Sequence, residues 1–161
     1  MRILRYDRSK VYEYAEKWAF GRNPAYYNFE NIGGDCTNYA SQCIYAGASV
    51  MNYTPGMGWY YKSLNDRTPS WSGVGYLYNF LVNNKGAGPF AEEIPLEKLE
   101  VGDIVQLGRS TGDFYHSPVV TRIERGNIFV AAHSYDVFDR PLDSYNYERV
   151  RGLHVLGVRT Y

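Results

Sequence analysis

This sequence has no long apolar run, no excess of basic over acidic residues or the reverse, and only three histidines. No run approaches the roughly 18 apolar residues of a membrane-spanning helix. The N-terminal MRILRYDRSK lacks the apolar core of a signal peptide, so we expect a soluble chain. A mature or trimmed form, working in the cell envelope or outside the cell, would also lack such a signal, which leaves the compartment open.

Neither basic nor acidic residues dominate the chain. The 17 basic and 17 acidic residues give a formal net charge of zero, and they form no long block of one sign. A nucleic-acid or membrane-surface partner would require a basic patch. We therefore expect neither nucleic acid nor an anionic membrane surface as a partner, and the oligomeric state is left open.

Cysteine is also rare, with two residues in 161. Both fall in GGDCTNYASQC, where Asp35 precedes a helical pattern that begins at Cys36 and that Gly47 would stop. Two turns of helix would hold Cys36 and Cys43 about 10 Å apart, too far for a disulfide or for one tetrahedral zinc ion. We expect no metal and no cofactor, and we interpret Cys43 as core filling.

Aromatic residues are abundant, at 17% of the chain. One helix is predicted after Asp7, because Val11, Tyr14, Ala15 and Trp18 share a helical face. Residues 51–70 read as a long loop, and SWSGVGYLYNFLVNN resumes the helical spacing.

Short β-rich runs replace the helical spacing after Pro95, namely VGDIVQLG, HSPVVTRIE, NIFVAAH and HVLGVR. Helices first and strands later indicate one α+β domain over residues 1–161, with N-terminal helices packed on a C-terminal antiparallel sheet.

Cys36 is placed where a nucleophile would be activated. Free backbone N–H groups and the positive end of the helix dipole favour a thiolate. The N–H of Cys36 itself can also donate to the oxyanion of a tetrahedral intermediate. A buried structural cysteine is the alternative interpretation.

The base must then be a histidine, and the chain has three. A two-residue turn at Arg125-Gly126 would place His133 opposite position 118, and one at Gly126-Asn127 would place it opposite position 120. Either position is on the same strand face as His116, whereas a three-residue loop would reverse this result. A cysteine, a base and a residue that orients the base form a thiol hydrolase. The sequence thus predicts Cys36, His116 and His133, with His154 as an ordinary strand residue.

Several motifs carry a family resemblance over nearly the whole chain: YDRSKVYEYAEKW, NPAYYNF, DCTNYASQC, GWYY, SWS, VGDIVQL, YHSPVV and AAHSYD. The chain resembles the putative amidase domain family of bacteria, which is similar to the papain-like superfamily of cell-wall peptidases and amidases. The resemblance implies a papain-like fold, a nucleophile at Cys36 and a base at His116. Its relatives carry a third, polar residue on the next strand, which matches His133, with Asp136 as the alternative.

Other site residues follow less directly from the sequence. Papain-like enzymes take an oxyanion donor from upstream of the cysteine, where Tyr27 and Asn31 are candidates. We expect Trp59, Tyr60 and Trp71 to line a substrate groove, because such rings offer an apolar face and a polar edge.

The sequence thus predicts a cysteine-dependent hydrolase that cleaves an amide or peptide bond through a thioester, with bacterial cell-wall peptide as one substrate. A non-catalytic peptide-binding or wall-binding module of the same fold and a thiol acyltransferase are the alternatives.

Overall fold

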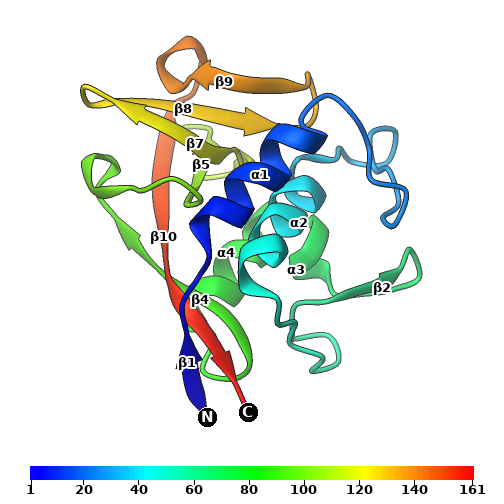
Figure 1. Ribbon diagram of the computed structural model, residues 1–161. Coiled ribbons are helices and arrows are strands. Elements are labelled where there is room, and N and C mark those ends of the chain that lie inside the picture. Colours follow the sequence, from blue (N-terminus) through cyan, green and yellow to red (C-terminus); the bar gives the residue numbers. More distant parts are fainter.

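A computed structural model describes residues 1–161 as an α+β structure in which helices lie against a curved antiparallel sheet (Figure 1). The helices are α1 (Arg8–Trp18), α2 (Cys36–Ala48), α3 (Pro69–Ser72) and α4 (Val74–Asn83), with single 3-10 turns η1 (Leu96–Lys98) and η2 (Leu142–Ser144). The strands are β1 (Arg2–Leu4), β2 (Tyr61–Ser63), β3 (Asp66–Arg67), β4 (Gly88–Ile94), β5 (Ile104–Gly108), β6 (Phe114–His116), β7 (Val119–Glu124), β8 (Asn127–Ala132), β9 (Val137–Pro141) and β10 (Arg149–Thr160).

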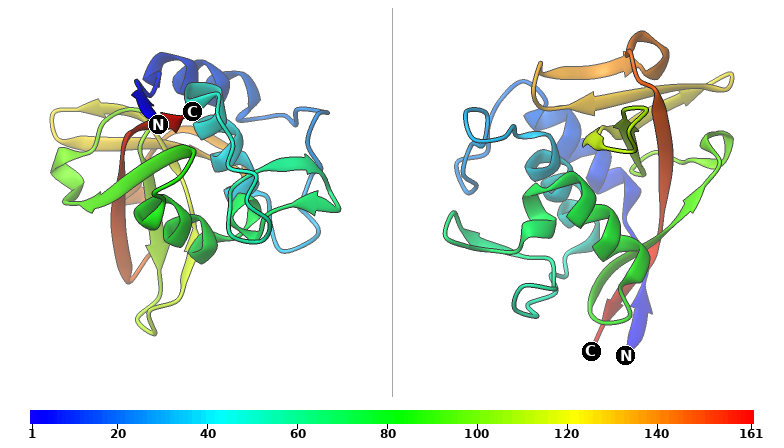
Figure 2. Two further views of the ribbon diagram at one scale, coloured as in Figure 1. Left: turned by 90° about the horizontal axis from the view of Figure 1, so that it is seen from below. Right: turned by 180° about the vertical axis from the view of Figure 1, so that it is seen from behind.

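The long strand β10 organises the sheet. It pairs with β5 over Arg149–Leu153, with β4 over Gly152–Arg159 and with β1 over Val158–Thr160. The main path runs β1-β10-β5-β7-β8-β9, with β6 also paired to β5. Figure 2 shows the two chain ends side by side, which agrees with the pairing of Arg2 with Thr160.

Hydrophobic residues cover both faces of the sheet. The larger cluster lies between the helices and the sheet and includes Val11, Tyr39, Ile104 and Val119. A smaller cluster on the opposite face includes Val105, Leu107 and Val120. The alternation of Ile104 and Val105 between the clusters follows from the two-residue period of a strand, so β5 is buried on both sides.

The predicted first helix is confirmed as α1. The Asp7 side chain caps it by accepting a hydrogen bond from the Lys10 amide at 3.2 Å. Val11 and Ala15 are buried, as their spacing predicts.

The helix predicted at the thiol does begin at Cys36, but Gly47 does not end it. It continues to Ala48, and Ser49 follows in the left-handed conformation. A Cβ at Gly47 would lie 2.5 Å from Val11 Cγ2 and 2.6 Å from the Asp7 carbonyl oxygen. Glycine therefore serves here to bring α1 and α2 close together.

Two other elements differ from the sequence interpretation. Residues 51–70 are not wholly irregular, because β2 and β3 form a small hairpin there. The helix expected from SWSGVGYLYNFLVNN is divided in two, since Gly73 has an extended conformation between α3 and α4. No helix is both long and apolar enough to cross a bilayer.

Candidate active site

Cys36 is the first residue of α2, and the helix start is packed inside the molecule. The residue is 8% exposed, and its neighbours Asp35 and Thr37 are buried as well. Its backbone N–H has no partner within the helix, because no earlier helical turn exists.

The thiol lies against the main chain on both sides of His116. Cys36 Sγ is 3.9 Å from the carbonyl oxygen of Tyr115 and 3.7 Å from the hydroxyl of Thr37. The backbone N–H of Ser117 also approaches it. The structure thus brings two predicted residues, Cys36 and His116, to neighbouring positions.

The environment of Cys36 favours the thiol over the thiolate. Burial raises its pKa, and the charge of Asp35 acts in the same direction. The Thr37 hydroxyl and nearby N–H groups oppose this effect without reversing it. Burial thus outweighs the nearby hydrogen bonds in setting the pKa of this thiol.

His116 closes β6 opposite Leu107 and is also 8% exposed. Its ring packs against Tyr145, with the ring centres 5.6 Å apart. Burial, and then the charge of Arg140, lowers the pKa of His116 to about 4. The imidazole is consequently neutral at neutral pH and can accept a proton, although it does not hydrogen-bond to the thiol in this arrangement.

A β-bulge in β7 places the side chains of the two predicted catalytic histidines on opposite faces of the sheet. The Arg125-Gly126 turn is confirmed, since Glu124 pairs with Asn127. The register then shifts between Val120 and Arg122, so that Val119 pairs with Ala131. One extra residue on one strand reverses the side-chain parity beyond it, and the prediction that His116 and His133 share a face is wrong.

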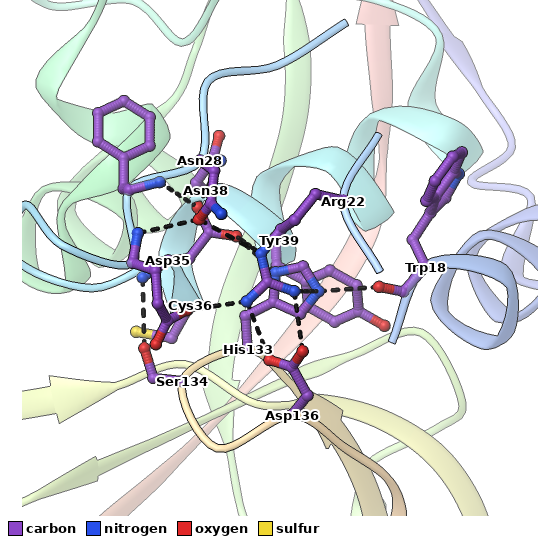
Figure 3. Close-up of polar contacts among 12 residues, drawn as sticks. Trp18, Arg22, Asn28, Asp35, Cys36, Asn38, Tyr39, His133, Ser134 and Asp136 are labelled. Carbon is purple, nitrogen blue, oxygen red and sulfur yellow. Dashed lines mark hydrogen bonds and ion pairs between the residues drawn. The ribbon is translucent and has the colours of Figure 1, made fainter. Parts of the chain in front are cut away.

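His133 instead lies on the helix side of the sheet, beneath the start of α2 (Figure 3). Its Nδ1–H donates to Asp35 Oδ2 at 2.5 Å, and its Nε2 is 2.8 Å from the carbonyl oxygen of Trp18. The ring stacks on Tyr39 with 4.0 Å between centres. Both nitrogens are thus engaged away from His116, and His133 is not placed to orient that ring.

Asp35 is buried and hydrogen-bonds to several residues around the start of α2, but its side chain does not cap the helix. Its Oδ1 accepts hydrogen bonds from the Phe29 amide at 2.8 Å and the Asn38 side chain at 2.9 Å. Burial by itself would raise the pKa of Asp35, but the hydrogen bonds from His133, Asn38 and Phe29 lower it on balance. The carboxylate therefore stays ionised beside the thiol.

Arg22 lies beside His133 and Asp136 in this cluster (Figure 3). Its guanidinium binds both carboxylate oxygens of Asp136, at 2.9 and 3.0 Å, and Glu30 at 2.8 Å. Its Nε lies 3.4 Å from Asp35 Oδ2. Asp136, the alternative to His133 in the sequence interpretation, thus holds Arg22 and has no hydrogen bond to His116.

A second buried network supports the strand that carries His116. Ser117 Oγ accepts hydrogen bonds from Thr37 Oγ1 at 3.3 Å and from Gln106 Nε2 at 3.2 Å. Arg151 in turn donates twice to Gln106 Oε1, at 2.9 and 2.7 Å. This network joins the residue after Cys36 to the residue after His116.

The predicted aromatic groove wall is mostly core. Trp59 and Trp71 are both 0% exposed, and their ring centres lie 4.7 Å apart. Their indole N–H groups donate to Ser41 and Asn38 of α2. Neither ring can touch a substrate, so these two assignments are wrong. Tyr60 is half-buried, and its hydroxyl donates to Asp66.

Tyr27 and Asn31, the upstream oxyanion candidates, both lie at the surface. Tyr27 is 37% exposed, and its ring packs edge-on against Phe29. Its amide donates to the Tyr61 hydroxyl, and its carbonyl accepts from Asn38, so only its side chain is available. The side-chain oxyanion donor stays a prediction, whereas the Cys36 N–H has a clear place at the helix start.

The remaining polar side chains offer no metal site. No group of three or more His, Cys, Asp or Glu residues is arranged to hold an ion. Both cysteines are free and buried. Cys43 lies in the core, as expected, and His154 is bound to the buried Asp103 at 2.8 Å.

The sequence interpretation missed three residues that take part in this site. Tyr145 packs on His116, Ser117 joins the second network, and Asp35 binds His133. Of the three, only Asp35 could have been found from the sequence, because an acidic residue directly before a proposed nucleophile can bind another residue of the site as well as cap the helix.

A protein family and one curated relative match most of this chain. The family model described as putative amidase domain matches residues 5–156. An uncharacterised protein of Bacillus subtilis (strain 168), YhbB, is 34% identical over 139 residues, which cover 84% of this chain. The chain spans 43% of the length of that relative. No solved structure matches the chain.

Proposed function

Because this chain belongs to the putative amidase domain family, we propose that it is a cysteine-dependent hydrolase of an amide or peptide bond. Cys36 attacks the carbonyl carbon, and His116 carries the proton. One observation carries the proposal: the thiol at the start of α2 touches the main chain next to His116.

The chemistry starts from two neutral groups. As the Cys36 sulfur bonds to the substrate carbon, His116 takes the thiol proton, so no stable thiolate is needed beforehand. The C–N bond then breaks, the departing amine receives that proton, and a thioester is left on Cys36. Water, deprotonated by His116, next attacks the thioester and releases the acid and the free thiol.

The oxyanion of both tetrahedral intermediates requires a donor. The Cys36 N–H at the helix start supplies one, aided by the positive end of the helix dipole. The same dipole stabilises negative charge as it develops on sulfur.

His116 has to turn towards the thiol during the reaction. Its ring packs on Tyr145. Catalytic hydrogen bonds are often long or absent before substrate binds. The proposal requires the imidazole to reach the sulfur from this position in the chain, since its neighbours Tyr115 and Ser117 both touch Cys36.

His133 has a supporting role in this proposal. With Asp35, Trp18 and Arg22 it fixes the segment that delivers Cys36. It acts on the start of α2 and does not act on the His116 ring.

A papain-like arrangement and a cell-wall peptide substrate are the finer parts of the proposal. The first is supported by a helix-borne cysteine packed against an antiparallel sheet that carries the histidine. The second is supported by the family resemblance of the sequence motifs. An acyltransferase would share the thioester and differ only in its acceptor, so product analysis separates the two reactions.

Alkylation of Cys36 by iodoacetamide tests the pair directly. Rates are measured from pH 5 to 10 in a Cys43→Ala background, with and without His116→Ala. His154→Ala is the matched control, since that histidine binds Asp103 on another part of the sheet. We expect His116→Ala alone to slow alkylation near neutral pH.

Turnover is then followed by mass spectrometry with a library of short peptides. General-base catalysis contributes about 10²- to 10⁴-fold, which sets the expected loss of kcat/KM in His116→Ala. Alkylation that ignores His116, together with no thioester and no cleavage, would overturn the hydrolase proposal in favour of a non-catalytic binding module.

A further inference from the structure

A surface depression of about 510 Å³ is lined by two residues that lie close to Cys36, although Cys36 itself is not part of its lining. Gly33, three residues before Cys36, lies on one side of it, and Tyr115, whose carbonyl touches the thiol, lies on another. The start of α4 forms its floor through Val74, Gly75 and Tyr76. The depression thus joins the surroundings of Cys36 to the start of α4.

A second depression, of about 590 Å³, continues this path. Tyr76 and Asn79 line both depressions. With Asn83 they fall at positions i, i+3 and i+7 of α4, which is one helical face. The three span about 10 Å of helix, enough for about three residues of an extended peptide.

This face of α4 is exposed and carries amide groups. Tyr76 is 63% exposed, and Asn79 and Asn83 are exposed too. The Asn79 side chain makes no hydrogen bond in the structure, so it can both donate and accept. A peptide group presents the matching acceptor and donor, whereas Tyr76 offers an apolar surface to side chains.

Charge distinguishes the far end of the path. Lys85 is the single ionised residue that lines the second depression, and it has no ion-pair partner. Asp113, in the first depression, is already paired with Arg109 at 2.7 Å. A negative group at the Lys85 end is thus the complementary one.

We propose that the α4 groove, made of these two depressions, binds the carboxyl-terminal segment of a peptide substrate, with its terminal carboxylate at Lys85. The inference rests on the proposed function and names its substrate class. Cys36 would attack a peptide bond a few residues before that carboxylate. The released amine product is the segment held in the groove, and water supplies the oxygen of the new acid on the other product.

Binding can be tested without turnover. The Cys36→Ser chain, labelled with ¹⁵N, is titrated with N-acetyl-tetra-alanine that bears a free carboxylate and with its carboxamide. We expect amide-signal shifts at Tyr76, Asn79, Asn83 and Lys85. The carboxamide should bind about threefold more weakly, because an exposed charge pair contributes only modestly.

Lys85→Met should remove the difference between the two peptides, and Asn79→Ala should weaken both. Lys10→Met, an exposed lysine of α1, is the matched control and should change neither. Shifts elsewhere, equal binding of both peptides to the unsubstituted groove, or stronger shifts with an N-acetylglucosamine trimer would overturn the proposal.

These outcomes are independent of the hydrolase test. Alkylation of Cys36 reports on the nucleophile, whereas the titration reports on the groove. Failure of one leaves the result of the other readable.

Discussion

His133 donates a hydrogen bond to Asp35, the residue directly before the proposed nucleophile, with 2.5 Å between Nδ1 and Oδ2. Both side chains are 1% exposed. The histidine predicted to orient the base is therefore part of the support beneath α2.

Loss of this buried pair should destabilise the chain. His133→Ala leaves the Asp35 charge buried without its shortest hydrogen bond, which costs about 3 kcal/mol of unfolding free energy. Urea denaturation at pH 7 measures the change. Asp113→Asn removes an exposed ion pair with Arg109 and should cost under about 1 kcal/mol. Equal losses would show that the His133 pair contributes nothing special.

As the pH falls, protonation of His116 should lower the free energy of unfolding before most carboxylates are protonated. The folded pKa is lowered from 6.5 to about 4, so the unfolded chain binds the proton more readily between these values. Stability contributed by the neutral ring is present above about pH 6.5 and is lost as the pH falls towards 4, by about 3 kcal/mol. Denaturation at pH 7 and 4.5 measures it.

A variant separates this histidine from other acid-sensitive groups. His116→Gln should flatten the dependence between pH 6.5 and 4, whereas loss below pH 4 should persist, because the lowered pKa of Asp35 belongs to that range. An unchanged slope in His116→Gln would refute the assignment.

Arg140 should tune the proton affinity of His116. Its guanidinium stacks on Tyr145, 3.6 Å from the ring centre, and Tyr145 packs on the imidazole. Removing that charge in Arg140→Gln should raise the His116 pKa above about 4, because a neighbouring positive charge disfavours imidazolium. An NMR titration of the imidazole signals measures the shift. Arg149→Gln, which loses only a bond to the Ser110 carbonyl, is the control.

Ser117 should matter for both stability and reactivity. Ser117→Ala leaves the buried side chains of Thr37 and Gln106 without a common acceptor, at a cost of about 1 to 3 kcal/mol. Alkylation of Cys36 should also slow, since this network sets the distance between α2 and β6. Ser110→Ala, at an exposed position, should leave both unchanged. A destabilised protein with a normal alkylation rate would limit Ser117 to the core.

Local patterns predicted the parts of the fold that depend on neighbours in sequence. The spacing from Val11 to Trp18 predicts α1, and one of the two turns considered, Arg125-Gly126, is the one observed. The start of α2 at Cys36 was also predicted. The strands β1, β4 and β9 were not, because their pairing with β10 or β8 is a tertiary effect.

The site was predicted less completely, for identifiable reasons. Cys36 lies against the main chain beside His116, and their pairing in catalysis stays a prediction. The face predicted for His133 was wrong because it depended on counting residues along an uninterrupted ladder. Trp59 and Trp71 were assigned to a surface because loops usually lie outside. Here the loop folds its indoles inward to the Ser41 and Asn38 side chains of α2.

Because of the bulge at Thr121, the layout of this site depends on the number of residues in β7. Thr121 is 2% exposed, and its hydroxyl donates to Asp139 at 2.6 Å, so the extra residue is well anchored. A substitution there alters the anchor but leaves the count of residues intact. Deletion of that one residue would rotate the strand by half a pleat and turn His116 and His133 towards the same side of the sheet.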